Sequence, residues 1–471
     1  MAMGSTLPES PPQDGLDPAR PDLPRQALTG WGRTAPTAAR VVHAHSGADM
    51  RRALQSIPPR GLLGRGLGRS YGDAAQNAGG TVVATAGAGE YVLDPETGVV
   101  TASAGASLDE LLRGIVPWGY FVPVSPGTRY VTVGGAIAAD IHGKNHHHAG
   151  SWCSHVRSFD LALPDGSVRT VTPENEPSLF WATAGGMGLT GLILQATFQC
   201  QSIPSSRLAV DTECTTDLDD VLERMASRDH EYDFSVAWID LMATGRTLGR
   251  SVLTRGWFAT PDQLPAAERR HPFAYDAEVL LHLPAVFPSG LLNPVTIRAF
   301  NELWYRKAPT HREGEIQTIP QFWHPLDMVG GWNHAYGPRG FLQWQLAIPF
   351  GSEDALRTIV GRFAKARCTS LVNVLKRFGP GNPGPLSFPI EGWTLSVDIA
   401  IGNPLVPRLL DELDEIVLEV GGRLYLAKDS RLRPDHLPLM YPELDAWRSV
   451  KAIVDPLNQI QSDLGRRLGL C

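Results

Sequence analysis

The segment 125–148 combines glycines with basic side chains in a pattern that suits cofactor binding. Gly127, Gly134 and Gly135 lack a Cβ atom, so the backbone there can approach a flat or phosphate-bearing ligand closely. The segment ends in the basic residues His142, Lys144, His146, His147 and His148. A glycine-lined backbone that ends in nitrogen donors predicts a site for a cofactor with an anionic linker and a reactive ring.

Two further glycine-rich segments lie on either side of this one in the sequence. They read GRGLGRSYG at 64–72 and GGMGLTG at 185–191, and their backbone amides can bind a pyrophosphate. A Rossmann NAD-binding protein is disfavoured, because no G-x-G-x-x-G motif with a ribose-binding acid follows a first strand. No metal site is predicted, because a regular element cannot turn three adjacent histidines toward one ion and no carboxylate cluster accompanies them.

The composition favours a loop-rich enzyme with more than one domain. The chain has 471 residues, among them 48 glycines and 38 prolines. Its net charge of -7 at pH 7 argues against nucleic acid as a partner. Five cysteines without paired spacing predict free thiols in a reduced compartment.

Residues 1–28 are expected to form a disordered arm, because they are rich in Pro, Asp and Ser and lack periodicity. Order is expected from about Trp31. The sequence shows no signal peptide and no apolar run of membrane-spanning length. Any membrane association is therefore expected to be peripheral and on the cytoplasmic face, with a periplasmic location through another export route left open.

The first part of the chain alternates short strands with capped helices. Strands are predicted at 40–45, 81–85, 90–93, 99–103 and 192–198, with a hairpin at 158–171. A helix capped by Ser46 is predicted to run to about Ile57. Ser107 and Glu110 form a capping box for a helix over 108–116.

From about Ser206 the pattern changes to strands that alternate with longer helices. The strands are predicted at 234–241, 251–258, 341–348, 370–376 and 394–401, and the helices at 218–226 and 353–366. This order predicts a second α+β domain on a largely antiparallel sheet. A strand at 423–427 and two helices interrupted at Asp455-Pro456 end the chain.

Period-two alternation places polar side chains of the second domain on common strand faces. Thr394, Ser396 and Asp398 share one face of their strand, and Gln343 and Gln345 share one face of theirs. Such a face can line a ligand site, and a solvated surface is the alternative interpretation.

Several motifs taken together resemble the vanillyl-alcohol-oxidase type of FAD enzyme. They are GRGLGRSYGD at 64–73, SPGTRYVTVGGAIAADIHGKNHHHAG at 125–150, LPDGS at 163–167, GLTG at 188–191, FGPGN at 378–382, GW at 392–393 and YLAKDS at 425–430. Each glycine motif is weak alone, but their order together with HGKNHH and AKDS is specific. Within the family, the resemblance is to the branch that oxidises the ribose C2 hydroxyl of decaprenylphosphoryl-β-D-ribofuranose.

The resemblance implies an α+β protein of two domains, with a PCMH-type FAD domain that is split in the sequence. Its parts are expected at 29–205 and 421–471, and an antiparallel-sheet substrate domain, 206–420, is inserted between them. In many relatives a histidine of the first glycine loop is covalently joined to the flavin. That loop contains Tyr71 here, which has no ring nitrogen, so non-covalent FAD is expected.

The resemblance also implies roles for individual side chains. Lys428 and His142 are the implied catalytic residues, and Lys428 can stabilise an alkoxide or act as a base near the reacting hydroxyl. A surface lysine after a strand is the alternative interpretation of Lys428. The implied substrate-binding residues are Tyr71, Lys144, Trp323, Gln345, Lys376, Thr394 and Ser396, with Lys376 suited to a sugar phosphate. The implied cofactor-binding residues are Gly64, Gly66, Gly68, Arg69, Ser70, Tyr71, Gly72, Pro126, Gly127, Thr128, Gly134, Gly135, Ala136, His142, Lys144, Met187, Gly188, Ile193 and Tyr425.

Four positions depart from the family pattern. Ser396 stands where cysteine is common, Thr394 and Met187 where asparagine is common, and Trp323 where tyrosine is common. A serine hydroxyl without a base is a poor nucleophile, so the thiolate that nitroaromatic inhibitors of the family trap is missing at this position. Met187 is expected to loosen one flavin contact.

The segment 279–292 is apolar and is broken by Pro284 and Pro288. Asn293-Pro294 then opens a helix with the apolar stripe Ile297, Phe300, Leu303 and Trp304. The surrounding basic residues are Arg269, Arg270, His271, Arg298, Arg306, Lys307 and Arg312. This pattern fits a polyprenyl phosphate or an anionic membrane surface, and it fits an ordinary core helix equally well.

The leading hypothesis is an FAD-dependent oxidoreductase that acts on a CH–OH group, the flavoprotein subunit of an epimerase in the cell envelope. The resemblance implies that it makes the 2-keto sugar, the first half of epimerisation to the arabinose donor for cell-wall arabinan. The implied partners are an NADH-dependent keto-sugar reductase and a quinone-type electron acceptor. The alternatives are an alditol or aldonolactone oxidase that uses oxygen, and a non-catalytic module that binds a nucleotide or a prenyl phosphate.

Overall fold

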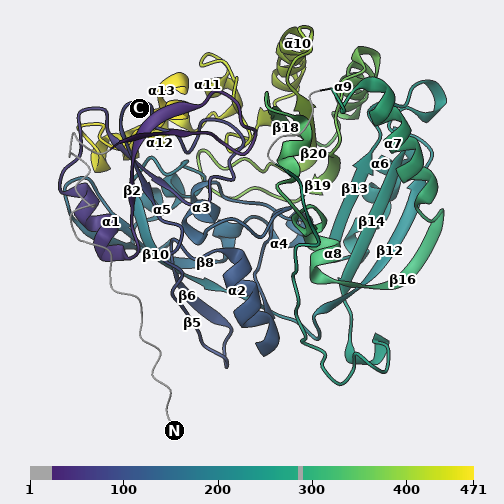
Figure 1. The fold of residues 1–471 in the computed structure, drawn as a ribbon, viewed down its shortest axis with the longest axis horizontal. Coiled ribbons are helices and arrows are strands. Elements are labelled where there is room, and N and C mark those ends of the chain that lie inside the picture. Colours follow the sequence, from purple (N-terminus) through teal and green to yellow (C-terminus); the bar gives the residue numbers. More distant parts are fainter. Residues whose placement is uncertain (1–23, 285–289) are drawn as a thin grey trace.

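The computed structural model describes residues 24–284 and 290–471 as a mixed α+β protein (Figure 1). Residues 1–23 of the predicted arm lie outside the described residues. Residues 25–28, predicted to belong to that arm, instead form strand β1 (Arg25–Leu28). This strand pairs with β2 (Thr37–His43), so its backbone groups are bonded and order begins before Trp31.

Two sheets carry the glycine-rich segments. The first has the order β1-β2-β4-β3, with β4 at Thr81–Ala84 and β3 at Leu62–Arg65. The second is antiparallel, with the order β5-β6-β10-β8-β9, and comprises Tyr91–Leu93, Val99–Ser103, Leu192–Gln199, Val156–Ala162 and Val168–Val171. The predicted strands and the hairpin are confirmed. A short pair joins β7 (Tyr120–Phe121) to β11 (Gln201–Ser202).

The helices of this part are short and begin at the predicted caps. Ser46 caps α1 (Gly47–Leu54), which ends three residues before Ile57. The capping box of Ser107 and Glu110 is present on α2 (Leu108–Ile115). The other helices here are α3 (Val133–Ala138), α4 (His146–Ala149) and α5 (Pro177–Thr183).

An eight-stranded sheet forms the other half of the molecule, at the right of Figure 1. Its order is β16-β12-β14-β13-β19-β20-β18-β21, and every pairing is antiparallel. These strands are His311–Thr318, Arg207–Thr215, Ser251–Phe258, Phe234–Ile239, Asn373–Phe378, Gly392–Ala400, Phe341–Pro349 and Arg423–Leu424. A separate parallel pair joins β15 (Leu281–His282) to β17 (Val329–Gly330).

The two faces of this sheet differ in chemistry. One face packs into a core with α6 (Leu218–Arg228), α9 (Glu353–Ala366) and α10 (Val406–Glu419). Alternate residues of β20 belong to this core, among them Leu395, Val397 and Ile399. The residues between them therefore point to the opposite face, as the alternation predicts. The remaining helices of the middle part are α7 (Pro294–Lys307) and α8 (Ile319–Trp323).

The C-terminal segment returns to the first part of the chain. The predicted strand at 423–427 is limited to β21, because the backbone turns at Tyr425, whose carbonyl accepts bonds from Lys428 and Asp429. Helices α11 (Leu437–Met440), α12 (Leu444–Val454) and α13 (Asp463–Leu468) follow, and Figure 1 shows α13 beside the N-terminal strands. Arg467 of α13 forms an ion pair with Asp73. The boundaries of a split domain at 205/206 and 420/421 stay predictions.

Among residues 24–284 and 290–471, no helix is long and apolar enough to cross a membrane. All five cysteines are free, and Cys153, Cys200 and Cys368 are buried. The prediction of free thiols is therefore confirmed.

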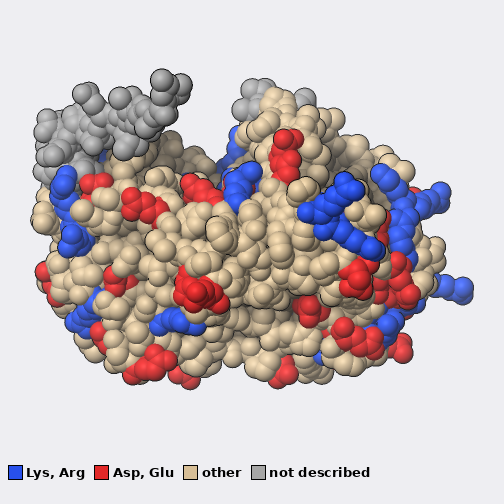
Figure 2. Space-filling model, turned by 90° about the horizontal axis from the view of Figure 1, so that it is seen from below, with Lys and Arg blue, Asp and Glu red and all other residues tan. Residues whose placement is uncertain are grey.

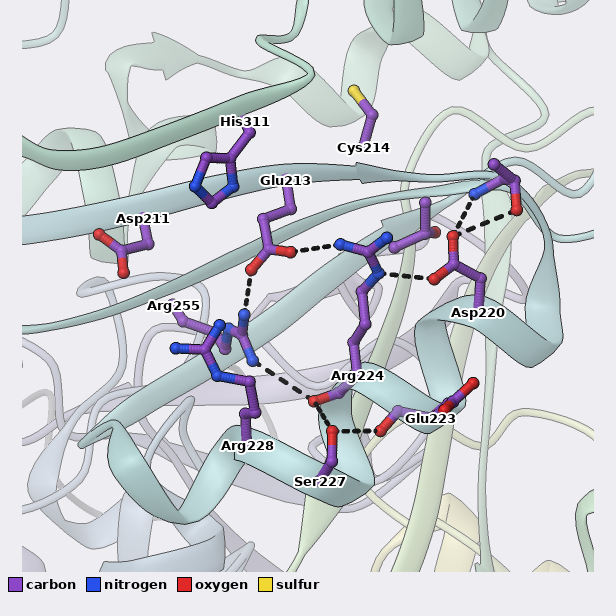
Figure 3. A network of polar contacts seen from close by, with 12 residues as sticks. Asp211, Glu213, Cys214, Asp220, Glu223, Arg224, Ser227, Arg228, Arg255 and His311 are labelled. Atoms are coloured by element: carbon purple, nitrogen blue, oxygen red, sulfur yellow. Dashed lines mark hydrogen bonds and ion pairs between the residues drawn. The ribbon is translucent and has the colours of Figure 1, made fainter.

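A buried ionic network joins α6 to strands β12 and β14 (Figure 3). The side chains of Arg255 and Glu213 expose 1% and 6% of their surface and form an ion pair. Arg224 of α6 bonds to the same carboxylate at 2.5 Å and to Asp220 at 2.5 Å. Although burial raises the pKa of Glu213, its bonds to the two arginines bring it below its usual value.

Replacing Glu213 with glutamine is expected to lower the free energy of unfolding by about 3 kcal/mol, because it leaves the buried Arg255 without its anion. Denaturant titration measures the effect. The matched control is Glu231→Gln, which removes an exposed pair with Arg228 and should change stability little. Equal stability of the two variants would contradict the structural role of the network.

Candidate active site

A cavity of about 690 Å³ lies where the three glycine-rich segments meet the eight-stranded sheet. The glycine-rich segments contribute residues of 64–71, 125–135 and 187–193 to its wall. The sheet contributes Val236, Trp238, Val252, Thr254, Gln343, Gln345, Val374, Lys376, Ser396 and Asp398. The cavity therefore joins the segments that sequence analysis assigned to a cofactor with those that it assigned to a substrate.

The glycine-rich wall presents open backbone. A Cβ atom on Gly127 or Gly188 would meet nothing within 4 Å, so a ligand can lie directly against these residues. Gly66 is required for packing, because a Cβ there would lie 2.1 Å from Thr132 Oγ1. The Arg69 guanidinium stacks on Trp31 at 3.9 Å, and its buried Nε has no hydrogen-bond partner. Open backbone beside an unsatisfied cation fits a flat ligand with an anionic linker.

His142 connects the cofactor wall to the sheet. Its Nε2 lies 3.0 Å from Gln345 Nε2, and its Nδ1 lies 3.2 Å from Lys376 Nζ. Gln345 also donates to Thr394 Oγ1 at 3.1 Å. Burial, with the charge of Lys376, holds the pKa of His142 well below its usual value, so the ring is neutral. A neutral ring has one lone pair, so His142 can accept a hydrogen bond from only one of these two donors in a given tautomer. The two contacts place its ring between Gln345 and Lys376.

Lys144 and Lys376 are half-buried side chains of the cavity wall. Lys144 Nζ donates to the carbonyl of Phe322 and lies 4.3 Å from the centre of that ring. Burial lowers the pKa of each lysine to about 7, and in Lys376 the charges of Lys144 and Lys428 add to the effect. Among the described residues, neither has an ion pair with a carboxylate. These two lysines therefore favour an anionic ligand.

Lys428 lies in the same cavity, with its Nζ 3.9 Å from the centre of the Tyr71 ring. Burial lowers the pKa of Lys428, although the charge of Asp398 raises it. Burial also raises the pKa of the Tyr71 hydroxyl well above its usual value. The interpretation of Lys428 as an ordinary surface lysine is wrong, because the side chain points into the cavity.

Most of the predicted site residues line this cavity. The departures Ser396, Trp323 and Met187 are among them, and so is Tyr425. Three predicted residues lie outside the lining: Gly72, Ala136 and Thr394. Gly72 packs against the backbone of Asp429, Ala136 is buried inside α3, and Thr394 contacts the cavity only through Gln345.

Sequence reasoning left Asp398 out of the site. It lines the cavity and shares a strand face with Ser396. The alternation had placed both residues on that face, but the family resemblance pointed only to Ser396. The structure also adds Trp332 and Gln343 to the lining.

The three adjacent histidines lie in different surroundings. His146 packs against Phe378 at 4.4 Å, His147 donates to the Tyr232 carbonyl at 3.0 Å, and His148 lies against His147. Within the part of the chain that the structure describes, no group of three or more His, Cys, Asp or Glu side chains could hold a metal ion.

Comparisons with known proteins agree with this arrangement. A family model described as FAD binding domain matches residues 38–172. Decaprenylphosphoryl-beta-D-ribose oxidase of Mycolicibacterium smegmatis is 45% identical over 449 residues, which cover 94% of this chain and 97% of that protein. The chain belongs to this family of FAD-dependent oxidases. The resemblance described from the motifs is confirmed.

Two other relatives show where the likeness is general. The uncharacterized protein in mprA 5'region of Streptomyces coelicolor is 42% identical over 77% of this chain and 100% of that protein. Cytokinin dehydrogenase 5 of Oryza sativa subsp. japonica is 30% identical over 38% of this chain and 36% of that protein. The match to cytokinin dehydrogenase 5 is thus limited to part of the chain, whereas the Mycolicibacterium and Streptomyces relatives match 94% and 77% of it.

FAD is the cofactor of this oxidase, and the residues present fit it. The open backbone at Gly127 and Gly188 leaves room for a planar ring, and Arg69 offers an unsatisfied donor for an anionic linker. When bound, FAD supplies an acceptor for a hydride. The surrounding polar side chains are of the types that can bind an alcohol, orient it and hold its proton.

We expect the FAD to be released when this oxidase is denatured, because Tyr71 offers no ring nitrogen for a covalent bond and its hydroxyl stays protonated. Precipitation with acid followed by absorption spectroscopy of both fractions measures this. Flavin in the supernatant is the expected result. Flavin that remains with the polypeptide would contradict the prediction.

Proposed function

We propose that this protein oxidises the ribose C2 hydroxyl of decaprenylphosphoryl-β-D-ribofuranose to the 2-keto sugar, the first half of epimerisation to the arabinose donor for cell-wall arabinan. The observation that carries the proposal is the grouping of three half-buried lysines in one cavity beside the glycine-rich wall: Lys144, Lys376 and Lys428. A phosphate on the substrate would offset the desolvation of these cations. The name of the Mycolicibacterium relative supports the same substrate.

The cavity offers the functions that oxidation of a secondary alcohol requires. Lys428 can donate to the developing alkoxide oxygen, because an ammonium group in a desolvated site stabilises negative charge strongly. Lys376, held by His142, can bind the phosphate. Trp323, packed against Phe234 at 5.0 Å, closes the wall and limits access of water.

An alditol or aldonolactone oxidase that uses oxygen is the alternative. Its substrates carry no charge, so they would leave the half-buried lysines uncompensated. Anaerobic mixing with a short-chain prenylphosphoryl ribose, monitored by the flavin's visible absorption, distinguishes the two. Rapid bleaching that a quinone analogue reverses quickly and air slowly is expected. Bleaching by free alditols alone would overturn the proposal. No flavin signal after addition of FAD would exclude both enzymes and leave the hypothesis of a non-catalytic binding module.

The proposal includes two partners and a location. A quinone-type carrier reoxidises the flavin, and an NADH-dependent reductase converts the 2-keto sugar to the arabinose epimer. The reductase follows from the chemistry of the product, which needs a two-electron reduction to complete an epimerisation. The carrier follows from the flavin, which must pass on two electrons before the next turnover. The enzyme works in the cell envelope, peripheral to the plasma membrane.

An apolar surface around α7 supports the membrane part of this proposal. Val295 and Leu303 expose 77% and 67% of their surface, while Ile297 is buried. Phe300 and Trp304 of the same helix line the cavity, so the apolar surface continues into the site. Figure 2 shows basic side chains on the side of the molecule formed by the eight-stranded sheet, at the right of the view. Pro288 lies outside the described residues.

The double variant Val295→Glu/Leu303→Glu is expected to bind weakly to vesicles that contain anionic lipid, because it places two charges on the apolar surface. Sedimentation with vesicles measures the bound fraction. The control is Val92→Glu, since Val92 of β5 is also highly exposed but belongs to another sheet. Equal sedimentation of both variants and the unchanged protein would contradict a role of α7 at the membrane.

Ser396 is expected to form no covalent adduct with a nitroaromatic inhibitor during turnover. It lines the cavity opposite Gln345 in the strand register, and no base bonds to its hydroxyl among the described residues. Intact-protein mass spectrometry after turnover measures this, and Ser396→Cys is the matched positive control, which should gain the mass of the inhibitor. An adduct at Ser396 itself would contradict the prediction.

A further inference from the structure

Asp398 of β20 is the one carboxylate among the described residues that line the cavity. Its side chain is fully buried. Oδ1 accepts a bond from Gln343, which lies directly opposite in the pairing of β18 with β20. Oδ2 is also buried, and it has no hydrogen-bond partner among the described residues. One oxygen is thus fixed across the sheet and the other is left unsatisfied.

The surroundings of Asp398 lack a direct counter-ion. Lys428 forms no ion pair with Asp398 among the described residues, although the charge of each group shifts the pKa of the other. The Tyr336 hydroxyl lies near the carboxylate and acts on it as a hydrogen-bond donor, although neither it nor Oδ2 has a partner in full hydrogen-bond geometry. The Tyr71 hydroxyl also interacts with Asp398. An unsatisfied carboxylate oxygen and an ammonium group without a carboxylate partner therefore share one cavity. A hydroxyl of a ligand can satisfy both, by donating to Oδ2 and accepting from Nζ.

The other polar side chains of the cavity are poor proton acceptors. A protonated Lys428 has no lone pair, and the nearby carboxylate favours this charged form. The single lone pair of neutral His142 faces either the amide of Gln345 or the ammonium of Lys376, depending on the tautomer, and burial holds its pKa well below its usual value. Tyr71 keeps its proton, because burial raises the pKa of its hydroxyl. Lys144 and Lys376 have pKa values of about 7, and the phosphate of the substrate would hold them protonated. The carboxylate with a free oxygen is then the remaining candidate.

We propose that Asp398 is the catalytic base, which takes the proton of the reacting hydroxyl on Oδ2 while Lys428 stabilises the alkoxide. This inference rests on the proposed oxidation of a secondary alcohol. The O–H bond breaks, its proton bonds to Oδ2, and its electron pair forms the second C–O bond. The C–H bond breaks with its electron pair, which leaves as a hydride and reduces FAD. The alcohol loses two electrons and two hydrogens, and the ketone is the product.

The sheet explains why this base is well placed. Gln343 holds Oδ1, so the orientation of the carboxylate does not depend on the substrate. Burial raises the pKa of Asp398 above its usual value, which makes it a stronger base than an exposed aspartate. The charge of Lys428 opposes this effect and favours the ionised carboxylate.

The variant Asp398→Asn tests the proposal, because it preserves shape and removes the base. We expect the rate of anaerobic flavin bleaching to fall about a hundredfold or more, with little change in substrate affinity or FAD content. The acid limb of the pH profile of kcat/KM should disappear. Lys428→Met should instead move that limb to higher pH, because loss of the ammonium group raises the pKa of Asp398.

Infrared difference spectroscopy provides a readout other than activity. After complete anaerobic bleaching by the substrate, the unchanged protein should show the carbonyl band of a protonated carboxylic acid, which shifts in D₂O. Asp398→Asn, bleached to completion over a longer time, should lack this band. Tyr336→Phe is the control for a purely structural effect and should keep the band.

The outcomes separate this inference from the proposed function. If the unchanged protein is not bleached by prenylphosphoryl ribose, the proposed function fails. If the unchanged protein is bleached, two results would overturn this inference. Asp398→Asn could be bleached at the same rate with the same acid limb, or it could still show the carboxylic acid band. Either result would mean that the base is another group.

Discussion

The desolvation of three lysines in one cavity is the constraint on which the site depends. Lys144, Lys376 and Lys428 are half-buried there, and Asp398 is the one carboxylate among the described residues of the lining. Removing ammonium groups from water costs free energy unless anions compensate. The protein without ligands thus keeps an excess of positive charge, which binding of an anionic substrate relieves. The excess of lysines over carboxylates favours an anionic substrate and adds to the effect of burial in lowering the pKa of Lys376. It also leaves Asp398 as the proposed base.

The eight-stranded sheet fixes the positions of the polar side chains in the cavity. Its apolar residues pack against α6, α9 and α10, so the positions of the polar residues on the other face are fixed by the core. Lys376, Ser396 and Asp398 reach the cavity because each alternates with a core residue of its strand. The glycine-rich wall contributes the other part of the site, a backbone surface that a planar cofactor can approach.

The sequence predicted the parts of the site that depend on local patterns. The glycine-rich segments, the strand faces and the family signature around Lys428 could be identified from the order of residues alone. The strand β1 could not, because its pairing with β2 is a tertiary contact and its own residues show no periodicity. The turn after β21 could not be predicted either, because it depends on hydrogen bonds that the carbonyl of Tyr425 accepts.

The pairing of side chains across the cavity needed the structure. The contact of His142 with Gln345 and Lys376 joins residues more than two hundred positions apart. The unsatisfied Oδ2 of Asp398 could be recognised only after the neighbours of the carboxylate were known. The alternation of β20 had placed Asp398 on the correct face, but it gave no reason to prefer that residue over a solvated aspartate.

The most direct test of the account is a calorimetric comparison of two ligands that bind to the FAD-loaded protein, a short-chain prenylphosphoryl ribose and its uncharged ether analogue. The pKa values of Lys144 and Lys376 lie at about 7 without a ligand, and a bound phosphate should raise them. The account predicts tighter binding of the phosphate, proton uptake on binding near pH 8, and weaker affinity as the pH rises. Equal affinity for the two ligands without proton uptake would contradict it.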